Sequence, residues 1–377
     1  MAARVLLVSP RYRPPHFRGG IERYVHVVAT ELQSLGYDCE IVSLAEDIPY
    51  ESSLPHRFLR VPRIPFLRPV LFGLRGRGLW RSADIVAVQY TPLGAAIPKD
   101  RLICTVHTTG RGEVVAMGPA GARAAPWKWL RRQVSVPFER FILRRARRVI
   151  AISEHVADEL AETYGVARDR ITVVGNGVDC EEFRPDGEPK GSQPLRVLYV
   201  GRLAKRKNID VLIRASGSLG RRVKLRIVGA GPEHDRLSTL ASAQGLPDAI
   251  EFRGFRTGES LLDEYRWADL LAVPSSYEGI PLAALEAKAM GLPLVVASFL
   301  GADKLVASGS GMLLPSFEAG DFARAFDMLA ADHGKLRSMA VNARREAMEK
   351  FSWRAAVLRL AEVFEEAIRG HPVSKRL

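Results

Sequence analysis

The sequence of 377 residues is poor in cysteine and has no long apolar run. Its three cysteines, Cys39, Cys104 and Cys180, are scattered and odd in number, which fits neither a disulfide framework nor a metal knuckle and indicates a reducing compartment. No apolar stretch approaches the roughly 20 residues that span a bilayer. The segment RVLLVSP, residues 4–10, is too short for a signal peptide and lacks a cleavage site. We therefore expect a cytoplasmic protein without a membrane-embedded segment.

Acidic residues are scarce in two stretches that carry the net charge of +13. Residues 55–83 hold seven arginines and no acid, and residues 111–148 hold ten basic residues against Glu113 and Glu139. Arginines interleaved with apolar side chains favour an anionic surface as partner, so we expect peripheral docking at the inner membrane face. The apolar residues concerned are Phe58, Leu59, Ile64, Phe66, Leu67, Leu71, Phe72, Leu74, Leu79 and Trp80 in the first stretch, and Trp127, Trp129, Leu130, Phe138, Phe141, Ile142 and Leu143 in the second.

Two other interpretations of these stretches stay open. The apolar residues could belong to the core, with the arginines on a solvated helix face. The charge would also suit nucleic acid, but the sequence has no recognised nucleic-acid-binding motif, and we expect no such partner.

The chain contains two halves that are built alike. Each begins with nearly the same strand, RVLLVSP from Arg4 and RVLYVGR from Arg196, and the connector 184–194 between them is rich in proline, glycine and charge. Continuous apolar strands alternate with helical patterns in both halves, which is typical of a parallel sheet covered by helices. Further strands are predicted at 40–44, 85–89, 102–106, 148–152, 171–174, 224–228, 250–253, 270–273 and 293–297.

This pattern predicts an α/β protein with two Rossmann-like, doubly wound domains and a ligand cleft between them. We place the domains at 1–184 and 185–351. An amphipathic helix within 352–377 is expected to pack back toward the first domain. The helix predicted at 21–36 ends on Gly36, a typical C-cap residue.

The stretch SSYEGIPLAALEAKAMGLPLV, residues 275–295, has one glutamate just before a helix start and another inside the helix. Pro281 suits the first helical position, and Gly291 ends the pattern, which predicts a helix over 281–290. The free N–H groups and positive dipole of a helix start bind phosphate. With Glu278 and Glu286 as acceptors on either side, the stretch suits a diphosphate that carries hydroxyl groups at both ends, such as a nucleotide sugar. The alternative is that Glu278 caps the turn and Glu286 is a solvated helix residue, which its small apolar neighbours disfavour.

Two other loops carry candidate ligand-binding residues. VGRLAKRKNID places Arg202 and Lys207 after a strand and a glycine, where a guanidinium and an ammonium can hold a diphosphate. Lys205 and Arg206 lie in the same loop, and a solvated basic loop is the alternative reading. RGGIERY follows the first strand, and its paired glycines permit close approach of a ligand to the backbone.

Together these motifs resemble the family-four retaining glycosyltransferases, or glycosyl transferases group 1, which have the GT-B fold. The resemblance covers almost the whole chain. The matching motifs are GGIERY (19–24), TVHT (105–108), VIAIS (149–153), VGNGVD (174–179), VGRLAKRKN (200–208), LRIVGAGP (225–232), FRGF (252–255), YEGIPLAALEAKAMGLPLVVAS (277–298) and FSW (351–353). Glu-x(7)-Glu enclosing Gly-x-Pro is the most specific of them.

The resemblance implies a hexosyltransferase that uses a UDP- or GDP-sugar and no metal or other cofactor, and the sequence has no Asp-x-Asp motif. By the resemblance, Arg202 and Lys207 bind the diphosphate and stabilise the leaving group. Glu286 binds the ribose hydroxyls and Glu278 lies by the donor sugar. His107 reaches the sugar or the acceptor. The remaining residues expected at the donor are Gly19, Gly20, Gly201, Phe255, Arg256, Gly279, Ile280, Pro281 and Leu282.

Two departures from the family pattern limit these expectations. HTTG, which begins at His107, lacks the acidic residue that often follows this histidine, so no general base for the acceptor is named. The segment 297–315 lacks the usual Gly-Gly turn and acidic residue, which leaves the sugar open. His107 could equally be a structural histidine.

We expect transfer to a glycan or lipid-linked acceptor with retention of configuration. The alternatives are a nucleotide-sugar epimerase of the same fold, a phosphorylase, for which no pyridoxal lysine is indicated, and a catalytically silent membrane or nucleic-acid binder.

Overall fold

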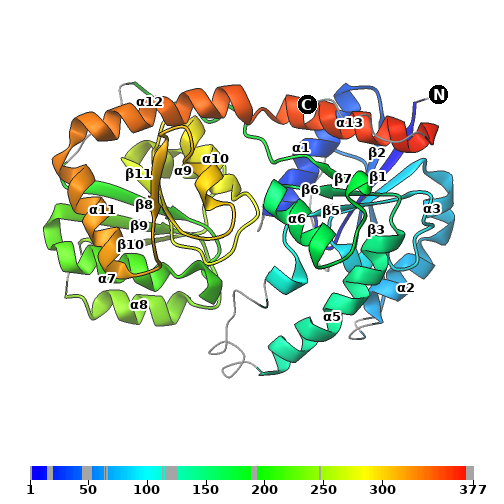
Figure 1. Ribbon diagram of the computed structural model, residues 1–377, viewed down its shortest axis with the longest axis horizontal. Coiled ribbons are helices and arrows are strands. Elements are labelled where there is room, and N and C mark those ends of the chain that lie inside the picture. The colour runs from blue at the N-terminus through cyan, green and yellow to red at the C-terminus, as the bar shows by residue number, and fades with distance from the viewer. Residues whose placement is uncertain are drawn as a thin grey trace. The chain divides into compact units, whose positions relative to one another are not determined.

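The computed structural model describes residues 2–14, 20–44, 53–62, 64, 67–112, 114, 126–187, 193–245 and 248–370, and for residues 126–134 it describes the backbone alone. The chain folds into two compact units. The first unit contains residues up to Asn176 together with helix α13 (Trp353–Arg369), and the second is Gly177–Ser352. Figure 1 shows a helix-covered sheet in each unit.

The first unit is built on a seven-stranded parallel sheet with the order β3-β2-β1-β4-β5-β6-β7. The strands are β1 (Arg4–Ser9), β2 (Asp38–Leu44), β3 (His56–Leu59), β4 (Ile85–Val88), β5 (Leu102–Val106), β6 (Arg148–Ala151) and β7 (Ile171–Val173). Its helices are α1 (Gly20–Ser34), α2 (Arg68–Arg75), α3 (Arg77–Ser82), α5 (Pro126–Arg145), α6 (Glu154–Glu162) and α13, with short 3-10 turns η1 (Thr91–Gly94) and η2 (Arg168–Arg170). Every residue of β4 and β5 is buried, as expected for central strands covered on both faces.

The second unit has a six-stranded parallel sheet with the order β10-β9-β8-β11-β12-β13. The strands are β8 (Leu195–Val200), β9 (Val223–Val228), β10 (Ile250–Gly254), β11 (Leu270–Val273), β12 (Leu294–Ala297) and β13 (Gly311–Leu314). The helices are α7 (Ile209–Leu219), α8 (His234–Ser242), α9 (Glu259–Trp267), α10 (Leu282–Ala289), α11 (Ala319–Ala331) and α12 (His333–Lys350), with 3-10 turns η3 (Lys205–Lys207), η4 (Gly220–Arg222) and η5 (Ala302–Leu305).

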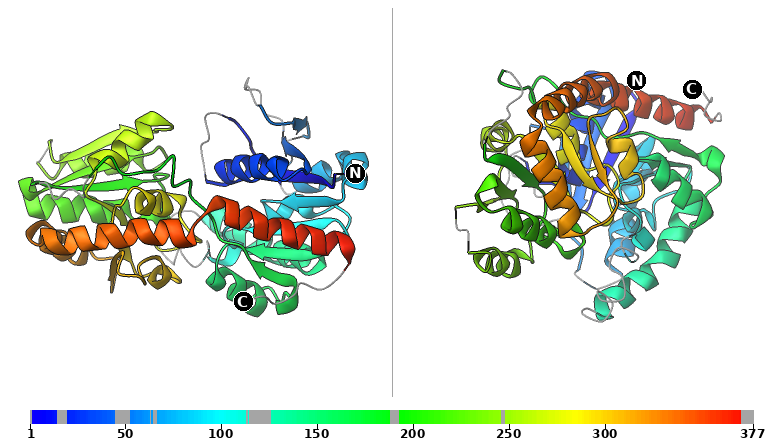
Figure 2. Two further views of the ribbon diagram at one scale, coloured as in Figure 1. Left: turned by 90° about the horizontal axis from the view of Figure 1, so that it is seen from above. Right: turned by 60° about the vertical axis from the view of Figure 1, so that its left-hand side comes forward.

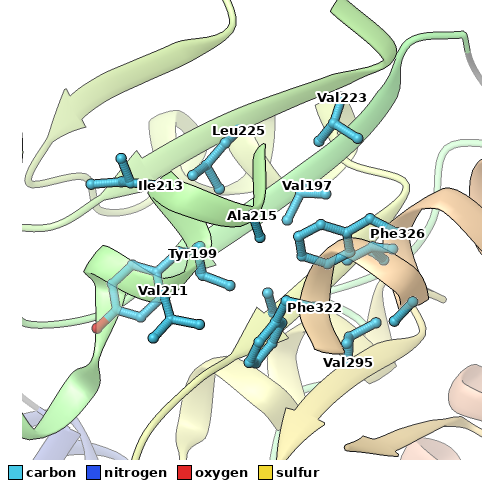
Figure 3. Close-up of a cluster of buried hydrophobic side chains, with 14 of the residues drawn as sticks. Val197, Tyr199, Val211, Ile213, Ala215, Val223, Leu225, Val295, Phe322 and Phe326 are labelled. Atoms are coloured by element: carbon cyan, nitrogen blue, oxygen red, sulfur yellow. The ribbon is translucent and has the colours of Figure 1, made fainter. Parts of the chain in front are cut away.

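The core of the second unit holds its central strands rigid. Figure 3 shows Val197 and Tyr199 of β8 packed with Ala215 of α7 and with Phe322 and Phe326 of α11. These side chains are at most 3% exposed. Large buried aromatic rings contribute several kcal/mol each to a core, so β8 gives the loop that follows it a fixed starting point.

The helix α13 at the end of the described chain packs on α1 within the first unit (Figure 2). The ring of Trp353 meets Tyr24 of α1 edge-on at 5.8 Å between centroids. Arg354 donates to the Glu31 carboxylate at 3.0 Å. The chain passes between the units twice, after Asn176 and after Ser352. The residues next to these two crossings are paired, because Val178 forms an isolated β-bridge with Ser352.

The predicted strands are all present, but the sequence analysis missed β3 and β13. Both are edge strands that pair with one neighbour only. An edge strand can leave one side partly open to solvent, so it does not need the continuous apolar run by which the central strands were recognised. The basic pattern of residues 55–83 hid β3, and β13 lies in the segment 297–315 that departs from the family pattern.

Several apolar residues predicted to face a membrane belong instead to the core of the first unit. Phe72, Trp80, Ile142 and Leu143 are buried there, and Leu59, Leu79 and Phe138 pack against the same cluster. Ile64, Leu67, Leu74 and Phe141 are exposed. Phe66 and the side chains of Trp127, Trp129 and Leu130 lie outside the described part of the chain. Among the described residues, no helix is long and apolar enough to cross a bilayer.

Candidate functional site

The order of strands in the second sheet reverses between β8 and β11, which lie side by side at its centre. In open parallel sheets, ligands bind at the carboxyl ends of the strands beside such a reversal, because the loops there diverge to opposite faces. The loops that leave these two strands are 201–208 and 274–281. They carry Arg202, Lys207 and Glu278, three of the four residues predicted to act in catalysis.

The two loops are tied together by hydrogen bonds through their backbones. Asn208 Nδ2 donates to the carbonyl of Pro274 at 3.1 Å. The amide of Ser276 donates to the carbonyl of Arg206 at 3.0 Å, and the Ser276 hydroxyl donates to the same oxygen at 3.1 Å. Asn208 adopts a left-handed conformation with φ of 47°, which turns the chain from η3 into α7. The cations and carboxylates on these loops are therefore held at fixed relative positions.

Lys207 and Arg206 converge on Glu278. The Lys207 ammonium pairs directly with Glu278 Oε1, and an Arg206 guanidinium nitrogen lies 3.5 Å from Glu278 Oε2. The same guanidinium donates to the carbonyl of Tyr277 at 2.7 Å. Lys207 and Glu278 are 14% and 7% exposed at their side chains, so this is a largely buried cluster with a net charge of +1 rather than a solvated basic loop.

Burial and charge oppose one another at these two groups. Burial alone would raise the pKa of Glu278, but the Lys207 and Arg206 cations together outweigh it and hold that pKa below its usual value. Burial lowers the pKa of Lys207, and the Glu278 carboxylate offsets only part of that effect. The Glu278 carboxylate therefore favours the charged form of the lysine, against the effect of burial.

Glu286 lies on α10, the helix that follows the second loop. It is buried, and the Tyr265 hydroxyl of α9 donates to its Oε2 at 2.6 Å. The alternative reading of Glu286 as a solvated helix residue is therefore wrong. The helix begins at Leu282, one residue later than predicted, because Pro281 occupies the cap position in an extended conformation. Gly279 is buried, while Ile280, Pro281 and Leu282 are half-buried.

Two glycines let the loop after β9 pass directly under the loop after β8. A Cβ at Gly229 would overlap the carbonyl oxygen of Gly201, and one at Gly231 would overlap that of Leu203. The backbones are joined there, since Leu203 N donates to the carbonyl of Ala230 at 3.1 Å. A Cβ at Gly201 would also lie 2.9 Å from the Tyr199 hydroxyl. The sequence offered a signal for this crossing, the Gly-x-Gly after a strand, but we assigned it no role.

Arg202, Phe255 and Arg256 lie on loops at the same edge of the sheet, after β8 and β10. Arg202 is exposed, and among the described residues its guanidinium forms no ion pair. Its backbone is fixed, since the Tyr199 hydroxyl donates to its carbonyl at 3.1 Å. Phe255 is also exposed. The structure does not bring these side chains into contact with Glu278 or Lys207.

In the first unit, His107 follows β5 and is held by two neighbours. Its Nε2 lies 3.1 Å from Gln89 Oε1, an acceptor, so Nε2 carries the proton and donates. The ring of Tyr24 meets it edge-on at 4.8 Å between centroids. Burial lowers the pKa of His107 to about 4, so the imidazole is neutral near pH 7. Gly20 is the first residue of α1, the helix that follows β1 in the chain, and Gly19 lies outside the described residues.

Sequence reasoning missed Tyr265 and left Arg206 ambiguous. No local pattern marks Tyr265, because its partner lies 21 residues away on another helix. The three adjacent basic residues of η3 are distinguished only by the directions in which their side chains point in the folded loop. Arg206 and Lys207 face Glu278, and Lys205 is exposed. Within the described chain, no three His, Cys, Asp or Glu side chains are grouped as a metal site requires.

Comparison with known proteins follows the division into two units. Residues 18–182 match the family described as Glycosyltransferase Family 4, and residues 181–346 match Glycosyl transferases group 1. A D-inositol 3-phosphate glycosyltransferase from Saccharomonospora viridis is 32% identical over 93% of this chain and 90% of its own length. One from Streptomyces bingchenggensis is 36% identical over 62% of this chain, and the match spans only 56% of that relative.

Solved structures share the fold at lower identity. Sucrose-phosphate synthase from Thermosynechococcus elongatus superposes with a TM-score of 0.84 at 22% identity, covering 98% of this chain and all of that chain. Anabaena Alr3699/HepE in complex with UDP and glucose has a TM-score of 0.77 at 19% identity, covering 96% of this chain and 99% of that one. With the two Rossmann-like sheets, these matches confirm the predicted GT-B fold.

Proposed function

Because the chain belongs to the glycosyl transferases group 1 family and is a glycosyltransferase, we propose that it transfers a hexosyl group from a UDP- or GDP-sugar with retention of configuration. The relatives are named for glycosyl transfer, and one structural neighbour is a complex with UDP and glucose, which favours UDP. The proposal needs no metal.

The observation that carries this proposal is the cluster of Lys207, Arg206 and Glu278 at the reversal point of the second sheet. When the bond to the sugar breaks, negative charge develops on the β-phosphate oxygen that had carried the sugar. Cations already fixed by the surrounding loops stabilise that charge without having to reorganise. Arg202, exposed at the same edge, adds a third cation that can close on the phosphates.

Among the routes that retain configuration, the state of Glu278 disfavours a double displacement through this residue. A double displacement would require this carboxylate to attack the sugar carbon as a nucleophile. Its two oxygens are engaged by Lys207 and Arg206, and these cations stabilise the charge that a nucleophile would have to give up. Attack by the acceptor hydroxyl on the face from which the diphosphate leaves needs no such nucleophile.

For the acceptor, we propose a glycan or lipid-linked molecule reached at the cytosolic membrane face. The described surface retains part of the expected apolar and basic pattern. Leu67 and Leu74 of the α2 region are exposed beside Arg75, and Phe141 of α5 is exposed between Arg140 and Arg144. The names of the curated relatives point to a second acceptor class, a free inositol phosphate. Both classes present a hydroxyl group that can attack the donor sugar.

A thermal-shift series with UDP, GDP and ADP tests the donor site, using wild type and Glu286→Gln. A nucleotide at 100 times its Kd adds about 2.7 kcal/mol to the free energy of unfolding. We expect one nucleotide to stabilise the wild type and the variant to lose much of that gain. If none of the three stabilises the wild type, the proposed donor site is wrong.

Transfer assays with the corresponding UDP- or GDP-hexoses test the rest of the proposal. We expect turnover in EDTA and an anomeric configuration in the product equal to that of the donor. The hexose of the donor is labelled for this assay. Transfer of the label to inositol phosphate would favour the acceptor named for the relatives, and label recovered in the lipid extract would favour a lipid-linked acceptor. Conversion of the donor without any acceptor would indicate an epimerase instead.

A further inference from the structure

One carboxylate of the donor site is held by a tyrosine from a different helix. The hydroxyl of Tyr265 on α9 lies 2.6 Å from Oε2 of Glu286 on α10, and both residues are buried. A tyrosine has a single proton to donate. The carbonyl of Ala283 is 3.4 Å away, so the nearer carboxylate oxygen is the better acceptor of this proton.

The position of Tyr265 is itself fixed by packing. Its side chain has no exposed surface, and its ring meets Phe183 edge-on at 5.9 Å with an interplanar angle of 82°. Tyr265 is also one of the residues around a pocket of about 450 Å³ beside α9, α10 and α12. The Tyr265 hydroxyl therefore cannot move away from Glu286 without displacing the ring from its contact with Phe183.

A glutamate on a helix can adopt several rotamers, and burial alone does not select among them. A short hydrogen bond from a neutral donor to a carboxylate is stronger than one between neutral groups and fixes the plane of the carboxylate. A carboxylate in one fixed plane can accept hydrogen bonds from two adjacent hydroxyl groups at once. A ribose presents such a pair, and a deoxyribose does not.

We propose that Tyr265 is the positioning residue that holds Glu286 for the ribose hydroxyls and thereby sets the preference of the site for ribonucleotides over deoxyribonucleotides. This inference rests on the proposed function, in which Glu286 binds the donor ribose. Tyr265 itself touches neither the donor nor the acceptor. Its effect reaches the ligand only through the carboxylate.

A purely structural role for Tyr265 makes a different forecast. If Tyr265 only fills the core, the Tyr265→Phe variant should be less stable and should bind every nucleotide more weakly by a similar factor. A positioning residue changes the ratio between nucleotides that have and lack ribose hydroxyls. The isosteric Tyr265→Phe variant keeps the ring contacts with Phe183 and removes the hydroxyl alone.

The experiment measures Kd by calorimetry for UDP, 2′-deoxy-UDP and 3′-deoxy-UDP, or for the GDP series if GDP is the nucleotide that binds. The proteins are full-length wild type, Tyr265→Phe, Glu286→Gln and Tyr164→Phe. Tyr164 is a matched control in the first unit, because it is also buried and also donates to a glutamate, Glu139, at 3.3 Å. Donor KM and kcat are measured on the same proteins.

We expect the wild type and Tyr164→Phe to bind the ribonucleotide about tenfold more tightly than either deoxynucleotide, which corresponds to about 1.4 kcal/mol. In Tyr265→Phe, the ratio of the deoxynucleotide Kd to the ribonucleotide Kd falls to within about twofold of the ratio in Glu286→Gln. The donor KM of this variant rises, while its kcat changes by less than about threefold.

A Tyr265→Phe protein with the wild-type ratio would overturn the inference, and so would one that weakens all three nucleotides equally. In both cases the proposed function would stand, because the wild type still binds the nucleotide. Absence of binding by the wild type to both the UDP and the GDP series would instead remove the proposed function, and the inference with it.

Discussion

At the scale of single residues, the site depends on a lysine whose charge is maintained by its neighbour. Lys207 is largely buried, and its pKa is lowered by burial against the opposing effect of Glu278. Removing the negative charge in Glu278→Gln leaves burial as the larger influence, so the pKa of Lys207 falls further. A lysine is charged below its pKa and neutral above it. A nucleoside diphosphate that binds the charged form therefore loses affinity as the pH rises through the lowered pKa.

Across a series from neutral to alkaline pH, we expect the Kd of Glu278→Gln for the nucleoside diphosphate to begin rising at a lower pH than that of the wild type, by up to about tenfold for each pH unit above the pKa of Lys207. The wild-type Kd should change far less over the same range. Calorimetry in buffers with different ionisation heats measures the accompanying proton uptake. Asp327→Asn, on the exposed surface of α11, serves as the control and should behave like wild type. Parallel pH profiles for Glu278→Gln and wild type would contradict this prediction.

At the scale of elements, α10 is anchored to α12 by a buried ion pair. Lys288 has no exposed side-chain surface and donates to Glu346 Oε2 at 2.6 Å and to the carbonyl of Leu305 at 2.7 Å. The Ser310 hydroxyl donates to the same carboxylate oxygen at 2.7 Å. This network joins α10, which carries Glu286, to η5 and to the start of β13. Breaking the network should therefore loosen α10.

Lys288→Met should lower the free energy of unfolding by about 3–5 kcal/mol, because it leaves Glu346 buried with less compensation. The double variant Lys288→Met/Glu346→Leu should lose less than the single variant, since no buried charge remains. Urea unfolding measures these differences, together with that of the single variant Glu346→Leu. A double variant that loses the sum of the two single effects would mean that the two residues are not coupled.

The elements also differ in how far the sequence predicts them. The end of α10 could be predicted because Gly291 acts locally, through a left-handed φ of 70°. The central strands could be predicted because burial on both faces imposes an apolar run. The edge strand β3 and the contact of Tyr265 with Glu286 could not. Both are decided by partners distant in the sequence, and neither leaves a local pattern.

The candidate site divides in the same way. Motif spacing singled out Glu278, Glu286 and Lys207 as candidates, and the structure places Lys207 and Glu278 in direct contact. The spacing did not distinguish Arg206 from Lys205, because adjacent residues in a 3-10 turn point in different directions that only the folded loop determines. The roles assigned to all the site residues stay predictions, those of Glu278, Glu286 and Lys207 included.

At the scale of the whole molecule, the excess positive charge is confined to the first unit, and part of it lies beside exposed apolar side chains. We expect the protein to sediment with vesicles of phosphatidylcholine and phosphatidylserine but not with phosphatidylcholine alone, and to dissociate as salt is raised. Phe141→Glu should weaken this binding, because it removes an exposed ring and adds a negative charge beside Arg140 and Arg144. Met328→Glu changes an exposed residue of the second unit and should not. Equal sedimentation with both kinds of vesicle, or with neither, would argue against membrane docking.

The bridge between Val178 and Ser352 has a consequence for the evolution of this chain. The second unit is one continuous segment that leaves the first unit and returns to it at a single point. Recombination between related genes can exchange such a segment whole, because its two ends lie next to each other in the fold. If the second unit binds the donor as proposed, a gene in this family could acquire a new nucleotide preference by exchanging that unit whole, with the first unit inherited unchanged.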